Sequence, residues 1–325
     1  MSWAEIAGQE QIVTILRNGL RNDKLSHAYL FVGPAGTGRK QMALELAKAV
    51  YCEGSGDDAC GTCLACRKVE HGNHPDIHWI EPDGASIKIE QIRELQQAMA
   101  YRSAGAGKKI YIIDKSERMT VQAANSLLKF MEEPISPVLA ILITENGHAL
   151  LPTIQSRAQW LTFHPLSKER LREQLIAEGH PAELAHPAAE LTAGLEAART
   201  LIQGNGFAET RSLVIQLMKD CLSQSSNMWM LMQSKLFKSE LSENVELLAD
   251  LLILFLKDLI HVRFHRNQDV VYIDQANWLE QHAWGREPAE WIRCIEYAME
   301  ARKRLRYHVN PQLALEQCLV RIQGV

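Results

Sequence analysis

A glycine-rich loop between two regular elements constrains the fold of this chain more than any other stretch. Residues 33–40 read Gly-Pro-Ala-Gly-Thr-Gly-Arg-Lys; they follow an apolar run at 28–32 and precede a helical pattern at 41–50. A strand, a glycine loop and a helix in this order form the frame of a phosphate-binding P-loop, in which backbone N–H groups and a helix N-terminus face an anion. The candidate nucleotide-binding residues are therefore Gly33, Gly36, Gly38, Arg39 and Lys40.

Two side chains that a working P-loop uses are missing from this loop. The pattern requires Lys and then Ser or Thr after the last glycine, whereas this chain has Arg39 and then Lys40. Arginine is bulkier and forked, so it does not simply replace a lysine that lies along the β- and γ-phosphates. Lys40 lacks the hydroxyl that binds Mg²⁺ and brings a cation near the place of the metal. The loop thus has the frame of a nucleotide site without all of its chemistry.

A second part of a nucleotide site is suggested by the apolar run at 109–113, which ends in Asp114. This pattern is typical of a Walker B strand, whose Asp holds Mg²⁺ and whose following Glu polarises the attacking water. Here the following residue is Lys115. An apolar run that ends in Asp is a weak signal alone, because many buried parallel strands end this way. Asp114 becomes a candidate only because a P-loop frame lies upstream.

Four of the seven cysteines lie close together in the sequence, at positions 52, 60, 63 and 66. Because C-x-x-C turns place thiolates near one another, and four thiolates fit one tetrahedral Zn²⁺, the cluster predicts a closed, structural zinc module over 52–66. A redox C-x-x-C pair is the alternative, but it would leave two thiols without a role. The predicted zinc ligands are Cys52, Cys60, Cys63 and Cys66.

The distribution of apolar runs predicts the fold class. In the first 165 residues, runs at 28–32, 76–80, 109–114, 139–144 and 159–163 alternate with helical patterns. Continuous apolar runs are typical of parallel strands that are buried on both faces, so we expect an α/β domain with helices on both sides of a parallel sheet. Beyond residue 165 the patterns are helical throughout. We predict domains at 1–165, 166–206 and 207–325.

Composition excludes few functions. The formal net charge is −4, so no global basicity indicates nucleic acid, although a local basic face is compatible with this total. The N-terminus has no apolar signal segment. The most apolar stretch, 247–260, is interrupted by charged residues and is too short to span a bilayer, so we expect a buried helix there. These features predict a cytoplasmic protein with no membrane partner.

Several stretches together resemble bacterial DNA polymerase III clamp-loader subunits, which belong to the AAA+ group. The four-cysteine insertion and the sequence Asn-Ser-Leu-Leu-Lys-Phe-Met-Glu-Glu-Pro at 125–134 are the most specific; residues 6–10, 26–31, 153–157 and 309–316 also match. The resemblance covers essentially the whole chain. It implies an AAA+ P-loop core at 1–165, an all-α lid at 166–206 and an all-α collar at 207–325 that assembles with other subunits.

The chain departs from the ATP-hydrolysing members of that family in three motifs. Those members have Lys-Thr in the P-loop, Asp-Glu in the Walker B strand and an arginine in the lid that senses the γ-phosphate. In this chain the P-loop pair is Arg39 and Lys40. The Walker B glutamate is replaced by Lys115, and the lid arginine by Ala197. Such departures resemble the delta-prime group, the ATPase-inactive end of the ring. These departures predict that the chain, as a subunit of the DNA-directed DNA polymerase holoenzyme, has no catalytic activity of its own. They do not decide whether the loop still binds nucleotide weakly.

One catalytic feature of the family is present. Ser156-Arg157 matches the family's Ser-Arg-Cys motif, with Ala158 in place of the cysteine. In that family the arginine reaches ATP held by the neighbouring subunit and stabilises charge on the transferring phosphoryl group, an effect of about 10³–10⁵ in the rate of other NTPases. A lone arginine at a helix end would be interpreted as a solvated side chain. With the motif in register, the resemblance implies that Arg157 is an arginine finger acting in trans.

The resemblance also implies the partners. They are the delta and tau/gamma subunits in a hetero-pentameric ring, which opens the beta sliding clamp and places it on primed DNA. Two alternatives remain: an ATP-hydrolysing tau/gamma-type subunit, and a zinc-containing, DNA-binding AAA+ scaffold. The second requires a basic surface around the cysteines, where Asp57 and Asp58 balance Arg67 and Lys68.

Overall fold

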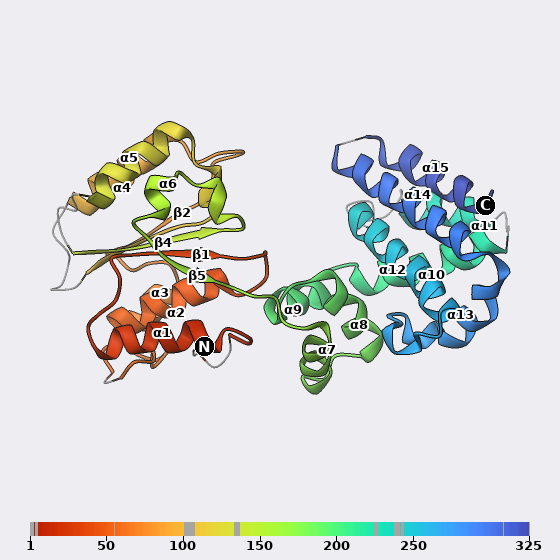
Figure 1. Cartoon of the computed structure of the whole chain (residues 1–325), viewed down its shortest axis with the longest axis horizontal. Coiled ribbons are helices and arrows are strands. Elements are labelled where there is room, and N and C mark those ends of the chain that lie inside the picture. The colour runs from red at the N-terminus through yellow and green to blue at the C-terminus, as the bar shows by residue number, and fades with distance from the viewer. Residues whose placement is uncertain are drawn as a thin grey trace. The chain divides into compact units, whose positions relative to one another are not determined.

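The computed structural model describes residues 3, 6–54, 56–100, 108–132, 137–223, 227–236, 241, 244–307 and 309–324. It divides into two units, Met1–Leu166 and Ser167–Val325 (Figure 1). The first unit holds the sheet and the second is helical. A further boundary near residue 206, between the expected lid and collar, stays a prediction. The expected loop at 101–107 lies outside the described residues.

The first unit is built on a five-stranded parallel sheet in the order β2-β3-β4-β1-β5. β1 lies between β4 and β5, so that Leu30 pairs with Leu142 on one side and with Trp160 on the other. All five predicted strands are present, and the α/β prediction is confirmed. The strands are β1 (Ala28–Val32), β2 (Ile77–Ile80), β3 (Lys109–Ile113), β4 (Val138–Thr144) and β5 (Gln159–Thr162).

Helices cover both faces of this sheet (Figure 1). Successive strand residues point to opposite faces. Leu30 and Leu142 therefore pack in one core with α4 (Ile89–Ala100), α5 (Val121–Glu132) and α6 (Pro152–Gln155). Phe31 and Ile141 pack in the other core with α1 (Glu10–Arg21) and α2 (Arg39–Tyr51). Burial on both faces explains why the inner strands β1 and β4 are almost entirely apolar, whereas the edge strand β5 has exposed polar residues at both of its ends. The short helix α3 (Leu64–Glu70) begins directly after Cys63, contains Cys66 and packs on α2.

The topology brings the predicted motifs to one edge of the sheet. Parallel strands have their carboxyl ends at the same edge, which is where open α/β sheets bind ligands. Gly33 follows β1, Asp114 follows β3 and Thr144 ends β4. The 3₁₀ turn η2 (Ser116–Arg118) follows β3, and the 3₁₀ turn η3 (Gly147–Ala149) follows β4. A site assembled here draws its residues from three neighbouring strands.

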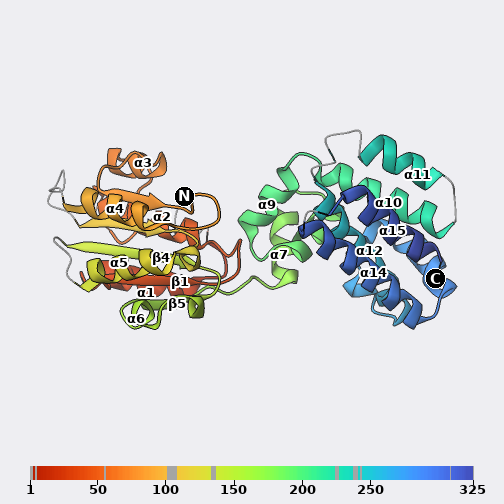
Figure 2. The same ribbon diagram turned by 90° about the horizontal axis from the view of Figure 1, so that it is seen from above.

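The second unit is helical, and α12 (Val245–Arg263) forms its centre, packing on both α10 and α14 (Figure 1 and Figure 2). The helix is buried along most of its length, as its apolar sequence predicts. Among the described residues, no helix is long and apolar enough to cross a membrane. The remaining helices are α7 (Lys168–Ala177), α8 (Ala182–Leu191), α9 (Leu195–Gln203), α10 (Phe207–Leu222), α11 (Asn227–Leu231), α13 (Ala276–His282), α14 (Pro288–Arg306) and α15 (Pro311–Gln323), with short turns η4 (Met232–Leu236), η6 (Asn267–Asp269), η7 (Ile273–Gln275) and η8 (Ala283–Gly285).

Candidate functional site

The glycine loop keeps the backbone of a P-loop. Gly36 and Gly38 have φ angles of 84° and 85°, in the left-handed region that favours glycine, and Gly38 precedes the first turn of α2. The buried side chain of Gln9 holds the loop by donating to the carbonyls of Thr37 (3.4 Å) and His164 (2.7 Å). The sequence therefore preserves the anion-facing frame, and the question is which charges now surround it.

Lys40 turns its ammonium group to the carboxylates at the strand ends. Its Nζ lies 2.8 Å from Asp114 Oδ2 and 2.9 Å from Glu81 Oε1. Burial lowers the pKa of Lys40, but the hydrogen bonds and charges of Asp114 and Glu81 outweigh it, so the pKa is raised and the cation is stabilised. Asp114 is only 3% exposed, so its carboxylate faces this ammonium rather than water. The residues present do not fit Mg²⁺, because an internal cation takes the carboxylate that the metal would use.

Arg39 is also balanced internally. Its side chain is 9% exposed, and Nη2 lies 3.9 Å from Glu145 Oε1. Burial is the largest influence and lowers the pKa of Arg39, and the negative charges of Glu145, Asp114 and Glu117 offset this only in part. None of these glutamates was identified from the sequence as part of the site. The signal was available, since Glu81 follows β2 and Glu145 follows β4, at the same edge as Asp114.

The other two departures lie where catalysis would need different groups. Lys115 follows Asp114 with a positive φ of 51° and begins the turn η2, so a cation stands where a catalytic carboxylate is expected. Ala197 lies in α9, and the nearby Arg199 donates to Glu178 over 2.9 and 2.6 Å within the same unit. This arginine is therefore engaged inside its own helical group, two positions from the sensor position.

Thr144 has a local structural role. It is buried, and its hydroxyl accepts a hydrogen bond of 3.1 Å from the backbone N–H of Asn146. The Asn146 side chain in turn accepts from the N–H of His148 and caps the turn η3. These contacts fix the chain direction at the end of β4.

The four clustered cysteines converge on one point. Their Sγ atoms all lie within 4.8 Å of one another, and those of Cys60 and Cys66 are 4.0 Å apart. Four sulfurs bound to one Zn²⁺ at 2.3 Å would be about 3.8 Å apart. All four cysteines are free thiols. The cluster could therefore hold a metal ion.

Backbone N–H groups point at these sulfurs. Cys60 N–H donates to the sulfur of Cys52, Cys63 N–H to that of Cys60, and Cys66 N–H to that of Cys63, over 3.3–3.4 Å. Such donors stabilise thiolates, and they lower the pKa of Cys60 to about 6. These three bonds reach the sulfurs of Cys52, Cys60 and Cys63, while burial raises the pKa of the Cys66 thiol to about 12. Four sulfur ligands fill a tetrahedral metal site and leave no coordination position for water.

The loop that carries the cysteines is fastened to α1. Asp57 forms ion pairs with Arg17 and with Arg21 (2.9 Å), and its carbonyl accepts a hydrogen bond of 3.0 Å from the indole of Trp3. The hydrogen bond from Arg17 is the main cause that lowers the pKa of Asp57, to about 2. Asp57 thus serves the docking of the module on the core, while Arg67 and Lys68 remain exposed.

A buried ion pair fastens the same module to α2. Lys48 is 1% exposed, and its Nζ lies 2.9 Å from Glu45 Oε1 in the same helix. It also pairs with Glu70, the last residue of α3. A buried cation must be compensated, because burying an unpaired charge is costly. The cysteine module therefore supplies a counterion to the helix that carries the P-loop.

Arg157 lies at the end of α6, whose Ile154 is fully buried against the core. The guanidinium is 36% exposed. Its Nη1 donates to the carbonyl of Thr153 over 3.0 Å, and its Nη2 pairs with Glu132 at the end of α5. The backbone is thus anchored while the charged tip lies at the surface of the first unit.

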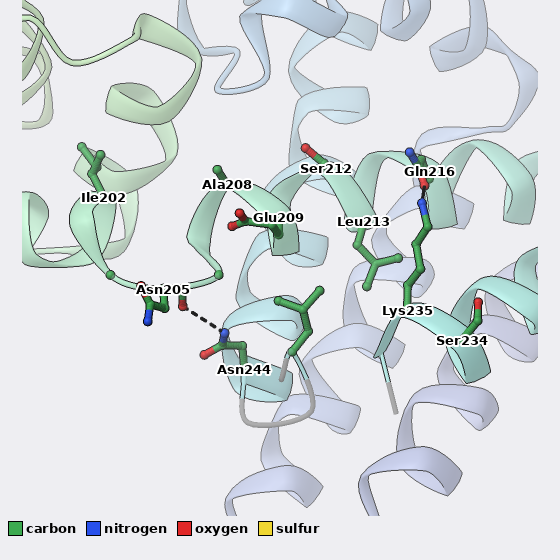
Figure 3. A pocket seen from close by; sticks show the side chains of 13 residues that line it. Ile202, Asn205, Ala208, Glu209, Ser212, Leu213, Gln216, Ser234, Lys235 and Asn244 are labelled. Atoms are coloured by element: carbon green, nitrogen blue, oxygen red, sulfur yellow. Dashed lines mark hydrogen bonds between the residues drawn. The ribbon is translucent and has the colours of Figure 1, made fainter. Parts of the chain in front are cut away.

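The second unit has an open groove beside α10 (Figure 3). Lys235 donates to Gln216 over 3.2 Å and Asn244 donates to the carbonyl of Asn205 over 3.4 Å across it. Among the described residues that line the groove, only Glu209 and Lys235 are charged, and they form no acid–base or metal-ligating set. The groove is therefore not assigned a role in the site.

Comparison with known protein families matches both parts of the chain. The model of "DNA polymerase III, delta subunit" matches residues 8–167, and that of "DNA polymerase III, delta subunit, C terminal" matches residues 206–324. Together they span the sheet unit and most of the helical unit.

Individual relatives agree with these matches. The DNA polymerase III subunit delta' of Bacillus subtilis is 36% identical over 327 residues, which is 99% of each chain. The delta' subunit of Pseudomonas aeruginosa is 34% identical over 61% of this chain and 62% of its own. The tau subunit of Bacillus subtilis is 36% identical over 57% of this chain but only 35% of its own length. A gamma subunit-related structure from Thermotoga maritima covers 95% of this chain and 98% of its own at 18% identity, with a TM-score of 0.46.

Proposed function

The chain belongs to the DNA polymerase III delta-subunit family, and from that premise we propose that it is a delta-prime-like subunit that hydrolyses no ATP itself and supplies Arg157 to a neighbouring ATPase subunit. It is a subunit of the DNA polymerase III clamp loader with an AAA+ core. Its part in DNA replication follows from that membership.

The ion pair between Lys40 and Asp114 carries the proposal that this subunit does not hydrolyse ATP. Phosphoryl transfer depends on a metal ion that bridges the phosphates and on a carboxylate that orients the attacking water. Lys40 lies on the carboxylate that would serve the metal, and Lys115 stands where the second carboxylate is needed. Arg39, packed against its own carboxylates, offers no free cation to the phosphates. All three features remove transition-state stabilisation from this subunit's own site.

The position of Arg157 supports its role as a finger in trans. A guanidinium is always charged and has a planar fork of donors that fits phosphate oxygens. Arg157 carries this group at the surface, on a short helix fixed by the buried Ile154. Such a residue could stabilise the charge that develops on a γ-phosphoryl group held by a neighbour, while its own subunit provides only the scaffold.

Substitution of Arg157 by Ala in the reconstituted complex tests this assignment. We expect the DNA-stimulated ATPase rate to fall by about 10³-fold or more, the range known for arginine fingers, while the complex still assembles. Arg266→Ala removes an arginine that is 60% exposed in the other unit and serves as the matched control, with an unchanged rate. An unchanged rate for Arg157→Ala would refute the finger assignment.

The metal in the cysteine cluster is proposed to be zinc with a structural role. Four thiolate ligands select Zn²⁺ among common cellular metals, and a closed site adds folding free energy rather than an activated water. The docking contacts of Asp57 and Glu70 support this, because both tie the module to core helices.

The ring and its partners are proposed from the family and from the surface of the second unit. Large apolar side chains lie exposed seven residues apart on two neighbouring helices: Ile292 and Met299 on α14, and Leu313 and Val320 on α15, each 49–62% exposed. This spacing places each pair on one helix face, which is typical of an association surface. We therefore propose that residues 207–325 form a collar in a pentamer with delta and tau/gamma subunits.

A double substitution tests the collar assignment. Ile292→Glu with Leu313→Glu should abolish retention of the chain by delta and tau/gamma in a pull-down, and Arg266→Ala should not. Retention of the double variant would contradict the assignment. Loading of the beta sliding clamp onto primed DNA by complexes with and without the chain then tests the complete proposal.

A further inference from the structure

The guanidinium of Arg157 is already occupied within its own subunit. One terminal nitrogen pairs with the Glu132 carboxylate, and the other donates to the Thr153 carbonyl over 3.0 Å and approaches the Ser156 hydroxyl at 3.5 Å. These are the same donors that an arginine uses to hold phosphate oxygens. A finger in this state must change partners before it can contact a nucleotide on another subunit.

Glu132 lies where its negative charge is poorly accommodated without a cation. It is the last residue of α5, and the C-terminal end of a helix carries partial negative charge from unpaired carbonyls. An acidic side chain there gains from a nearby arginine. Conversely, the carboxylate and the helix end both attract Arg157. The packing of α5 on α6 keeps the backbones of the two residues together.

We propose that Glu132 is a positioning residue for the arginine finger: it holds Arg157 withdrawn on its own subunit until the γ-phosphate of a neighbouring nucleotide displaces it. The inference rests on the proposed role of Arg157. The carboxylate and the phosphate compete for one guanidinium, so the finger engages in response to bound nucleotide. The exchange keeps the cation paired with an anion in both states and breaks no covalent bond.

Exposure sets the size of the effect. Arg157 and Glu132 are 36% and 42% exposed, so water screens their attraction. Pairs of this kind change an equilibrium by about 1.4- to 5-fold. Loss of the Glu132 charge should therefore help the finger to engage by a factor in this range, far smaller than the effect of losing the finger itself.

Glu132→Gln in the reconstituted complex tests the proposal. The amide has the same shape but no charge, so we expect kcat/KM for ATP without DNA to rise about 1.4- to 5-fold. The increase should shrink at high salt, where the wild-type pair is already weakened. An unchanged or lowered kcat/KM would overturn the proposal, because a residue that only orients or stabilises Arg157 cannot accelerate the reaction when it is removed.

Two controls separate this result from others. Asp23→Asn removes a carboxylate from another exposed ion pair, with Lys108 at 3.3 Å, at a positive φ that Asn tolerates, and should leave kcat/KM unchanged. In an Arg157→Ala background, Glu132→Gln should have no effect; an increase there would overturn the proposal. If Arg157→Ala itself changes nothing, the finger assignment fails, whereas a large loss with Arg157→Ala and no gain with Glu132→Gln refutes only the role of Glu132.

Discussion

The P-loop region and the cysteine cluster lie on either side of α2 in the sequence and differ in what their polar groups contact. In the P-loop region, Lys40 faces Asp114 and Glu81, and Arg39 faces Glu145, so positive and negative charges satisfy one another. In the cysteine cluster, the sulfurs converge and receive only weak N–H and O–H donors. The charged groups of the first region are paired with one another, whereas the sulfurs of the second converge on a point that could hold a metal ion.

The difference teaches how a lost site and a retained site can be told apart when both keep their backbone frame. A P-loop whose glycines still adopt left-handed φ angles looks intact in outline. Its function depends on unbalanced positive charge that phosphate oxygens can neutralise, and internal carboxylates have removed that imbalance. The four sulfurs lie within 4.8 Å of one another, which is close to the spacing that a tetrahedral metal ion imposes on its thiolate ligands.

Removal of one cysteine is the strongest test of this contrast. Cys63→Ser should abolish the single equivalent of zinc that we expect per chain and lower the free energy of unfolding of the first unit by about 4 kcal/mol or more, the range typical of a lost structural metal. Metal analysis and denaturant unfolding measure both effects. Cys221→Ser, at a buried thiol of the other unit, should leave the zinc content unchanged. If the wild-type chain contained no metal, the cysteine cluster, like the P-loop, would have kept its backbone frame without binding a ligand.

Two lysines of α2 allow a test at matched chemistry. Lys48→Ala leaves the buried Glu45 without a counterion and undocks Glu70, so it should cost about 3–5 kcal/mol of unfolding free energy. Lys40→Ala should cost less, about 1–2 kcal/mol, because Lys40 and Glu81 are 53% and 54% exposed and the shortened side chain admits water to the buried Asp114 carboxylate. Urea unfolding of both variants gives the two values. Equal losses of unfolding free energy would show that the contacts of Lys48 with Glu45 and Glu70 are no stronger than those of Lys40 with Asp114 and Glu81.

A buried aspartate of the second unit offers a case without any cation in direct contact. Asp258 is fully buried and accepts hydrogen bonds from the N–H groups of Val271 and Tyr272. Burial outweighs these bonds and raises its pKa from 3.8 to about 7. Between about pH 4 and 7 the folded state therefore binds more protons than the unfolded state, and the free energy of unfolding falls as pH rises, by at most about 1.4 kcal/mol per pH unit.

The Asp258→Asn variant isolates that pH dependence. Its unfolding free energy, measured by urea titration across pH 4 to 8, should lose this slope relative to wild type, because the amide does not titrate. Parallel curves for the two proteins would mean that Asp258 stays ionised in the folded chain, and that backbone donors alone can do for a buried carboxylate what Lys40 does for Asp114.

Restoration of the P-loop side chains is expected to have the smallest effect. Arg39→Lys with Lys40→Thr frees Asp114. Position 115 would still hold a lysine instead of the catalytic carboxylate, and position 197 an alanine instead of the sensor arginine. We therefore expect no ATP turnover by the isolated double variant, measured as phosphate release and compared with wild type. Turnover would show that the two loop residues alone separate this subunit from an ATPase.

Much of this organisation was predictable because it depends on local pattern. Parallel strands that are buried on both faces are rich in apolar residues, so the strands were predictable, β1 and β4 most clearly because they are almost entirely apolar. The cysteine spacing fixed the candidate metal ligands. Glu81 and Glu145 follow predicted strands, so their place at the sheet edge could have been found, but that they pair with Lys40 and Arg39 could not. Glu132 was not predictable, because an acidic residue at a helix end has no distinguishing spacing. Their meaning comes from residues that are distant in sequence.

The family, the α/β core, the four possible metal ligands and the loss of the P-loop lysine–threonine pair all follow from the order of the residues. Which groups now pair with Lys40 and Arg157 depends on the fold. Lys40 and Asp114 are far apart along the chain and meet because parallel strands end at one edge of the sheet. Arg157 and Glu132 meet because two helices pack on the same core. Electrostatic interactions fall off over a few ångströms, and only the fold sets distances on that scale.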